Sequence, residues 1–126
     1  MQTLKTYKQA VNPSNRKGLV FMFHGLNSRV GHGSHIAKFL ANEGYEVVGF
    51  DHRGLGTSQK TSTVEGVNFS SHIQDSTTFI NKIKAQYPTS TKYYALGLSL
   101  GGLTSFHLAS NFRAVILMAP AIQKIQ

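Results

Sequence analysis

The sequence predicts an α/β fold in which helices sandwich a mostly parallel β-sheet. Short apolar runs of strand length alternate with segments whose apolar residues recur at three- and four-residue spacing. The runs are continuous, as in "LVFMF" over 19–23, which is typical of parallel strands buried on both faces. This alternation predicts parallel βαβ units. The 126 residues, 40% hydrophobic and 14% charged, suffice for one small globular domain.

Each expected element has its own local signal. Ser34 is the expected N-cap of the first helix and Gly44 its end, and Pro88 closes the second helix. One face of the second helix gathers residues at helical spacing: Ile73, Thr77, Ile80, Ile83 and Tyr87. The elements are expected in this order: an edge strand over 3–11, a turn over 12–18, a buried strand over 19–23, a helix over 34–44, a buried strand over 45–51, a polar loop over 52–71, a helix over 73–87, a strand over 92–99, a helix over 100–112 and a last apolar strand over 114–120.

Four buried strands and one N-terminal edge strand are therefore expected. The last strand runs almost to the end of the chain, and no further segment follows to cover the sheet on that side. This arrangement predicts that residues 1–126 form one partial domain, cut off within a larger fold.

Composition and charge exclude several classes of protein. The absence of cysteine excludes disulfides and thiolate metal sites. Residues 1–10 lack the apolar region of a secretory signal, and no apolar run approaches the roughly 20 residues of a spanning helix, so a cytoplasmic location is expected. The net charge of +8 would attract nucleic acid or an anionic membrane. The basic residues are scattered and not interleaved with aromatics, so no nucleic-acid partner is expected, whereas a peripheral membrane contact stays open.

The stretch "GLSLGG", residues 97–102, is the first candidate for chemistry. It has the form G-x-S-x-G and lies where a buried strand is expected to end and a helix to begin. That context is the one in which a nucleophilic serine sits on a sharp turn. Ser99 is then the candidate nucleophile, and small neighbours at Gly97, Gly101 and Gly102 avoid clashes at the strained turn. The alternative is a glycine-rich turn with an incidental serine.

Two further motifs follow expected strands upstream. "FHGLNS", residues 23–28, is placed to complete an oxyanion hole, with the backbone N–H groups of Leu26 and Leu100 as donors. His24 and Gly25 are expected to support that loop, with His24 holding it by a hydrogen bond rather than acting as a base. "GFDHRGLGTS", residues 49–58, ends a strand in Asp51, whose expected role is to fix the glycine-rich loop or Arg53 rather than to catalyse.

His-Gly, then Asp-His-Arg-Gly-x-Gly-x-Ser, then Gly-Leu-Ser-x-Gly-Gly, in this order, resembles the α/β-hydrolase superfamily. The similarity runs from about residue 19 to 120 and is strongest to the monoacylglycerol lipase and lysophospholipase branch, which is grouped with serine aminopeptidases. The resemblance implies a truncated α/β-hydrolase core. It also implies a serine esterase without metal or cofactor, acting on small ester or lipid substrates through an acyl-enzyme on Ser99.

The same resemblance implies a lid, a triad Asp and a triad His after the last strand, and none of these has a counterpart in the chain. His107 is the only histidine after Ser99, and it lies about 12 Å along the expected helix, out of reach. Two hypotheses follow. The chain is the N-terminal part of a lipase-like hydrolase, or it is a truncated, impaired paralogue that binds a lipid or a protein and self-associates through its exposed sheet edge.

Overall fold

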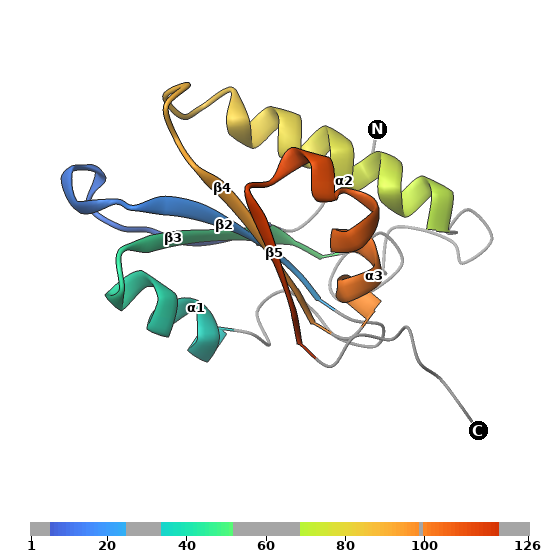
Figure 1. The fold of residues 1–126 in the computed structure, drawn as a ribbon, viewed down its shortest axis with the longest axis horizontal. Helices are drawn as coiled ribbons and strands as arrows, with labels where there is room; N and C mark the ends of the chain where they lie inside the picture. Colours follow the sequence, from blue (N-terminus) through green and yellow to red (C-terminus); the bar gives the residue numbers. More distant parts are fainter. Residues whose placement is uncertain (1–5, 25–33, 52–68, 99, 119–126) are drawn as a thin grey trace.

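The computed structural model describes residues 6–24, 34–51, 69–98 and 100–118. Five strands form one sheet in the order β1-β3-β2-β4-β5 (Figure 1). Four strands pair in parallel, and β1 pairs antiparallel with β3 at one edge. The predicted α/β class, with its mostly parallel sheet and antiparallel N-terminal edge strand, is confirmed. The strands are β1 (Thr6–Gln9), β2 (Gly18–Phe23), β3 (Tyr45–Phe50), β4 (Tyr93–Leu98) and β5 (Ala114–Met118).

Three α-helices cover the two faces of this sheet: α1 (Ser34–Asn42), α2 (Phe69–Lys84) and α3 (Leu100–His107). In Figure 1, α2 and α3 lie on one side of the sheet and α1 on the other. Short 3-10 turns at Pro13–Asn15 and Ala109–Asn111 precede β2 and β5. Within the described ranges, no helix has the length and apolar character needed to cross a membrane.

The residues of β2 alternate between two separate cores. The larger core, under α2 and α3, contains Leu19, Phe21, Phe23, Val48, Phe50, Phe79, Ile80, Ala95 and Leu108. The smaller core, under α1, contains Val20, Met22, Ala37, Val47 and Leu96. Every residue of β2 is buried because this strand lies in the middle of the sheet. This explains why its sequence is continuously apolar rather than alternating.

Three predictions of secondary structure need correction. The second helix begins at Phe69, inside the segment predicted as loop, because its first turn is polar and hides the helical period. Its buried positions include His72 and Ser76, whereas Thr77 is exposed and its hydroxyl donates to the Ile73 carbonyl at 2.9 Å. The third helix ends at His107 rather than at residue 112, and a 3-10 turn follows.

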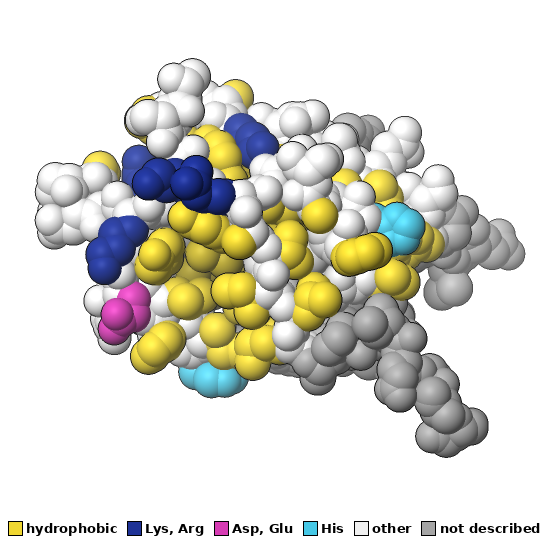
Figure 2. Space-filling model, viewed as in Figure 1, with side chains coloured by type: hydrophobic (Ala, Val, Ile, Leu, Met, Phe, Trp, Pro, Cys, Tyr) yellow, Lys and Arg dark blue, Asp and Glu magenta, His cyan; other side chains and the backbone are white. Residues whose placement is uncertain are grey.

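The last strand is not buried as predicted. Ile116, Leu117 and Met118 are 50%, 40% and 43% exposed, although β5 is wholly apolar. Among the described strands β5 pairs only with β4, so it is an edge with one neighbour. Figure 2 shows apolar side chains gathered across the middle of the face on which β5 lies.

Candidate active site

The carboxyl ends of β2, β3 and β4 meet at one edge of the sheet. Phe23 pairs with Gly97 and Met22 with Gly49, so the residues that follow these strands are brought to the same place. His24 follows β2, Asp51 follows β3, and the junction of β4 with α3 lies beside them. The strand ends that carry the three motifs therefore lie side by side. Residues 25–28, 52–58 and 99 of these motifs lie outside the described part of the chain, and the roles predicted for them stay predictions.

The junction between β4 and α3 has the context predicted for a nucleophile. The strand ends at Leu98 and the helix begins at Leu100, so one position, that of Ser99, separates them. Leu100 is the first residue of α3, and the N–H groups of a helix's first turn have no carbonyl partner within the helix. The backbone N–H of Leu100 is therefore suited to donate to an anion, as expected for an oxyanion donor.

The glycines beside this junction are required by close backbone contacts. A methyl group on Gly97 would overlap the Gly101 carbonyl oxygen and come within 2.6 Å of the Gly102 Cα atom. A methyl group on Gly101 would overlap the Phe23 carbonyl and lie 3.0 Å from the His24 carbonyl oxygen. The first turn of α3 thus packs directly on the ends of β4 and β2. Only glycine allows this approach, which fixes where α3 begins relative to the two strand ends.

His24 and Asp51 form a buried pair next to this turn. Their side chains are 1% and 2% exposed, and the His24 Nε2 atom lies 4.0 Å from the Asp51 Oδ1 atom. Both residues directly follow strand ends, and the His24 carbonyl oxygen lies beside Gly101 of α3. This geometry fits the expected supporting roles of the two side chains, which remain predictions because the loops that they would hold lie outside the described residues.

A second buried histidine, which the sequence reasoning missed, joins the site from α2. The His72 Nε2 atom lies 2.9 Å from the Thr104 Oγ1 atom of α3, and Thr104 is fully buried. The His72 ring also lies 6.3 Å from the Phe50 ring, centroid to centroid. The sequence did contain a signal for it: His72 lies four residues before Ser76 and eight before Ile80, which puts all three on the helix face that proves to be buried.

The electrostatics of this edge disfavour positive charge on His72. Burial, together with repulsion from His24, lowers the pKa of His72 from its ordinary value of 6.5 to about 4. His72 is therefore neutral near pH 7 and can share one proton with the Thr104 hydroxyl. The neutral, buried imidazole of His72 links α2 to α3 through its contact with Thr104 and adds no charge beside the His24–Asp51 pair.

The remaining described histidines are exposed. His107 is the last residue of α3, is exposed, and packs its ring 5.0 Å from the Phe69 ring. This agrees with the prediction that it cannot reach residue 99. His35 is exposed at the start of α1, and His32 and His52 lie outside the described ranges. Within those ranges, no three His, Cys, Asp or Glu side chains are grouped so that they could hold a metal ion.

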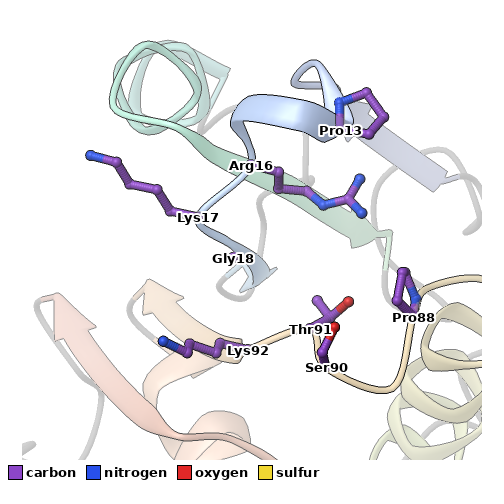
Figure 3. Close-up of a pocket in the computed structure, with 8 residues that line it drawn as sticks. All are labelled: Pro13, Arg16, Lys17, Gly18, Pro88, Ser90, Thr91 and Lys92. Carbon is purple, nitrogen blue, oxygen red and sulfur yellow. The ribbon is translucent and has the colours of Figure 1, made fainter.

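Hollows lined by described residues lie at the opposite edge, where the strands begin. One is formed by the segments before β2 and β4, and Figure 3 shows the eight residues that line it. Two others flank Tyr87 at the end of α2. None of them includes His24, Asp51 or the β4–α3 junction. The candidate active site is defined here by the strand ends that the described residues bring together.

Comparison with known sequences agrees with the convergence of motifs at this edge. A sequence profile of the family described as serine aminopeptidase, S33 matches residues 14–126. A curated relative, the probable lysophospholipase L2 of Haemophilus influenzae, is 28% identical over 109 residues, which cover 84% of this chain and 34% of the relative. The chain thus spans about a third of the length of the curated relative that it matches.

Solved structures share the fold. The monoacylglycerol lipase of Paleococcus ferrophilus superposes with a TM-score of 0.70 at 24% identity, over 98% of this chain and 45% of that one. A thermostable carboxyl esterase from Bacillus coagulans gives a TM-score of 0.76 at 19% identity, over 90% of this chain and 39% of that one. A monoglyceride lipase variant from Saccharomyces cerevisiae gives a TM-score of 0.68 at 21% identity, over 91% of this chain and 39% of that one. The predicted α/β-hydrolase architecture is confirmed by these likenesses.

Proposed function

The chain belongs to the serine aminopeptidase S33 family, and from this premise we propose that the protein is a serine hydrolase that cleaves carboxylic esters through an acyl-enzyme on Ser99. The observation that carries the proposal is the β4–α3 junction. A strand and a helix are separated by residue 99 alone, and glycines on both sides allow the helix start to pack on the strand ends. A sharp strand-to-helix turn of this kind is what a nucleophilic serine needs to project from the sheet.

The chemistry follows from these groups. The Ser99 hydroxyl oxygen attacks the ester carbonyl carbon, and its proton passes to a base. The base then protonates the leaving alcohol as the ester C–O bond breaks. The backbone N–H groups of Leu26 and Leu100 stabilise the oxyanion, since such donors act where negative charge develops. Water then attacks the acyl-enzyme, regenerating Ser99 and releasing the acid.

The proposed substrates are single-chain lipid esters. The sequence relative is named as a probable lysophospholipase, and two of the structural neighbours are a monoacylglycerol lipase and a monoglyceride lipase. Lysophospholipids and monoacylglycerols share one feature, a single acyl ester on a glycerol unit. We therefore place the substrate in this shared class without choosing the head group.

The base is not assigned to a described residue. His107 lies at the far end of α3, and His24 and His72 are buried in contacts with neighbouring elements. Both half-reactions need a base, because it takes the Ser99 proton during acylation and activates water during deacylation.

The test uses a fluorophosphonate, which reacts with an activated serine. We expect labelling of the protein on the peptide that contains Ser99, and loss of labelling in Ser99→Ala. Ser90→Ala, at an exposed position on the opposite edge, serves as the matched control and should label normally. Hydrolysis of a monoacylglycerol is then followed for the same variants. Labelling at another residue, or equal hydrolysis by Ser99→Ala, would contradict the proposal.

A second proposal, binding through self-association, rests on the edge position of β5 among the described strands. An apolar strand with one paired side tends to add a strand from another chain. If two copies pair through β5, light scattering should show a dimer that Ile116→Lys converts to a monomer. If the unaltered protein is a monodisperse monomer, self-association through β5 is contradicted.

A further inference from the structure

The hollow at the amino ends of β2 and β4 has a chemical character unrelated to ester hydrolysis. It has a volume of about 360 Å³ and lies between the turn before β2 and the segment between α2 and β4 (Figure 3). Its lining residues are Pro13, Arg16, Lys17, Gly18, Pro88, Ser90, Thr91 and Lys92. Since β2 has six residues at about 3.3 Å each, roughly 20 Å separate this hollow from the carboxyl edge.

The lining is basic and carries no acidic residue. Lys17 and Lys92 are exposed, and Figure 3 shows both extending to the same side of Gly18. Arg16 lies on the other side of Gly18, near Ser90 and Thr91. Figure 2 shows Lys and Arg side chains gathered toward this end of the molecule, so an incoming anion meets positive charge from two separate segments.

Arg16 is held in place before any ligand arrives. Its side chain is 14% exposed, its guanidinium lies 4.8 Å from the centre of the Tyr87 ring, and its Nη1 atom lies 3.7 Å from the Glu46 Oε1 atom. The Glu46 carboxylate already accepts hydrogen bonds from the Val11 N–H and the Tyr87 hydroxyl. A guanidinium has five N–H donors, so its remaining groups can serve a ligand at little entropic cost.

Hydrogen bonds also fix the backbone segments that border the hollow. The Lys17 N–H donates to the Gly44 carbonyl at 2.7 Å, and the Leu19 N–H donates to the Lys92 carbonyl at 2.9 Å. The Thr91 N–H donates to the Pro88 carbonyl at 3.0 Å. The two segments that carry the basic side chains are therefore joined to each other and to the β3 side of the sheet. Their charges are brought together by the fold, although they are about 75 positions apart in the chain.

We propose that this hollow is an anion site that binds a phosphate group. Ammonium groups on one side of Gly18, and a guanidinium and two hydroxyl donors on the other, are groups that bind phosphate oxygens. The ligand is either a small free phosphate compound or the head group of an anionic phospholipid, which have this phosphate chemistry in common. The site does not depend on Ser99 or on the proposed esterase activity.

The experiment titrates the protein with inorganic phosphate while backbone amide resonances are followed by NMR. Sodium chloride of equal ionic strength is the reference. We expect saturable shifts confined to residues 16–18 and 90–92, and an affinity loss of about tenfold or more in the double variant Lys17→Gln/Lys92→Gln. The matched control, Lys38→Gln/Lys82→Gln, removes the same charge from exposed positions on α1 and α2.

Vesicles then distinguish the two sources of phosphate. Vesicles of phosphatidylcholine with and without phosphatidic acid are sedimented with the protein and with both double variants. Binding that requires phosphatidic acid and Lys17 with Lys92 identifies a membrane head group, whereas saturable phosphate binding without vesicle binding identifies a free ligand. The proposal is overturned if both double variants weaken binding equally, because the effect would then be general charge attraction, or if phosphate shifts no resonance beyond the chloride reference.

Discussion

The imidazole of His72 and the hydroxyl of Thr104 join α2 to α3 across 2.9 Å. The two residues are 32 positions apart, and both are buried. Because α3 begins directly after residue 99, this contact helps to hold the helix that supports the proposed nucleophile. Both groups are buried beside the larger core, so removing either partner leaves a polar atom of the other without this contact.

Replacing Thr104 with valine keeps the side-chain shape and removes the hydroxyl. We expect the free energy of unfolding to fall by roughly 1–3 kcal/mol, because a buried ring nitrogen loses its partner. Urea unfolding monitored by circular dichroism measures the change. Thr78→Val is the matched control, since Thr78 is exposed and its hydroxyl donates only to the Gln74 carbonyl of its own helix. Equal effects of the two substitutions would contradict the role assigned to Thr104.

Stability should decrease as the pH falls from about 6.5 to about 4. The folded pKa of His72 is about 4, below its ordinary value, because of burial and of repulsion from His24. Below pH 6.5 the unfolded chain binds a proton that the folded chain does not, so stability present above pH 6.5 is lost toward pH 4. The shift corresponds to roughly 3 kcal/mol. The titratable group that acts on the ring is His24.

Unfolding by urea at a series of pH values from 7 to 4 tests this loss. His72→Gln should flatten the dependence over that range, whereas His107→Gln, at an exposed position, should leave it unchanged. A curve of the same slope in His72→Gln and the unaltered protein would show that another group causes the loss.

Gly101→Ala should reduce fluorophosphonate labelling, whereas a glycine substitution on the opposite edge should lower stability alone. Gly101→Ala places that group against the Phe23 carbonyl, so α3 must move and the proposed oxyanion donor at Leu100 with it. We expect fluorophosphonate labelling to fall at least about tenfold. Gly44→Ala, at a φ of +98° on the opposite edge, should cost about 1 kcal/mol of stability and leave labelling intact. Similar labelling of the two variants would refute the importance of the glycine contact.

Tyr87→Phe should lower the stability of the protein at neutral pH and reduce the part of that stability that is lost in acid. Burial by itself would raise the pKa of Glu46, but hydrogen bonds from Tyr87 and Val11 and the charges of Lys8 and Arg16 outweigh it and lower the pKa. Stability from Glu46 is therefore present above its ordinary pKa of 4.5 and lost as the pH falls through the lowered value. Without the Tyr87 hydroxyl the folded pKa moves toward the ordinary value, so this contribution becomes smaller. Urea unfolding at pH 7 and in acid, with Tyr94→Phe on the other face as control, measures the difference.

The sequence predicted the sheet well because its strands are continuous apolar runs. It located β2, β3 and β4 to within one residue. It failed where a signal depends on tertiary neighbours. The apolar run over 114–120 predicted a buried strand at the uncovered side of the sheet, but Ile116 is half exposed, and the exposed Thr77 occupies a position with helical spacing.

The buried polar side chains of the site were harder to predict than the strands that position them. His72 lies in a stretch, "FSSH", that reads as a polar loop, and its partner Thr104 is in another helix. Nothing local in either segment indicates the other. The basic hollow was missed for the same reason, since Lys17 and Lys92 are scattered in sequence and meet only because β2 and β4 are neighbours.

The strand order also has a consequence for synthesis on the ribosome. The central strand, β2, is made early, but its neighbour β4 begins only at Tyr93. A nascent chain that has not yet reached Tyr93 can pair β2 with β3 on one side, while the apolar side chains from Leu19 to Phe23 border an unpaired edge. Such intermediates expose strands that associate with other chains, so we expect this protein to depend on chaperones during translation more than a protein whose neighbouring strands are made in succession.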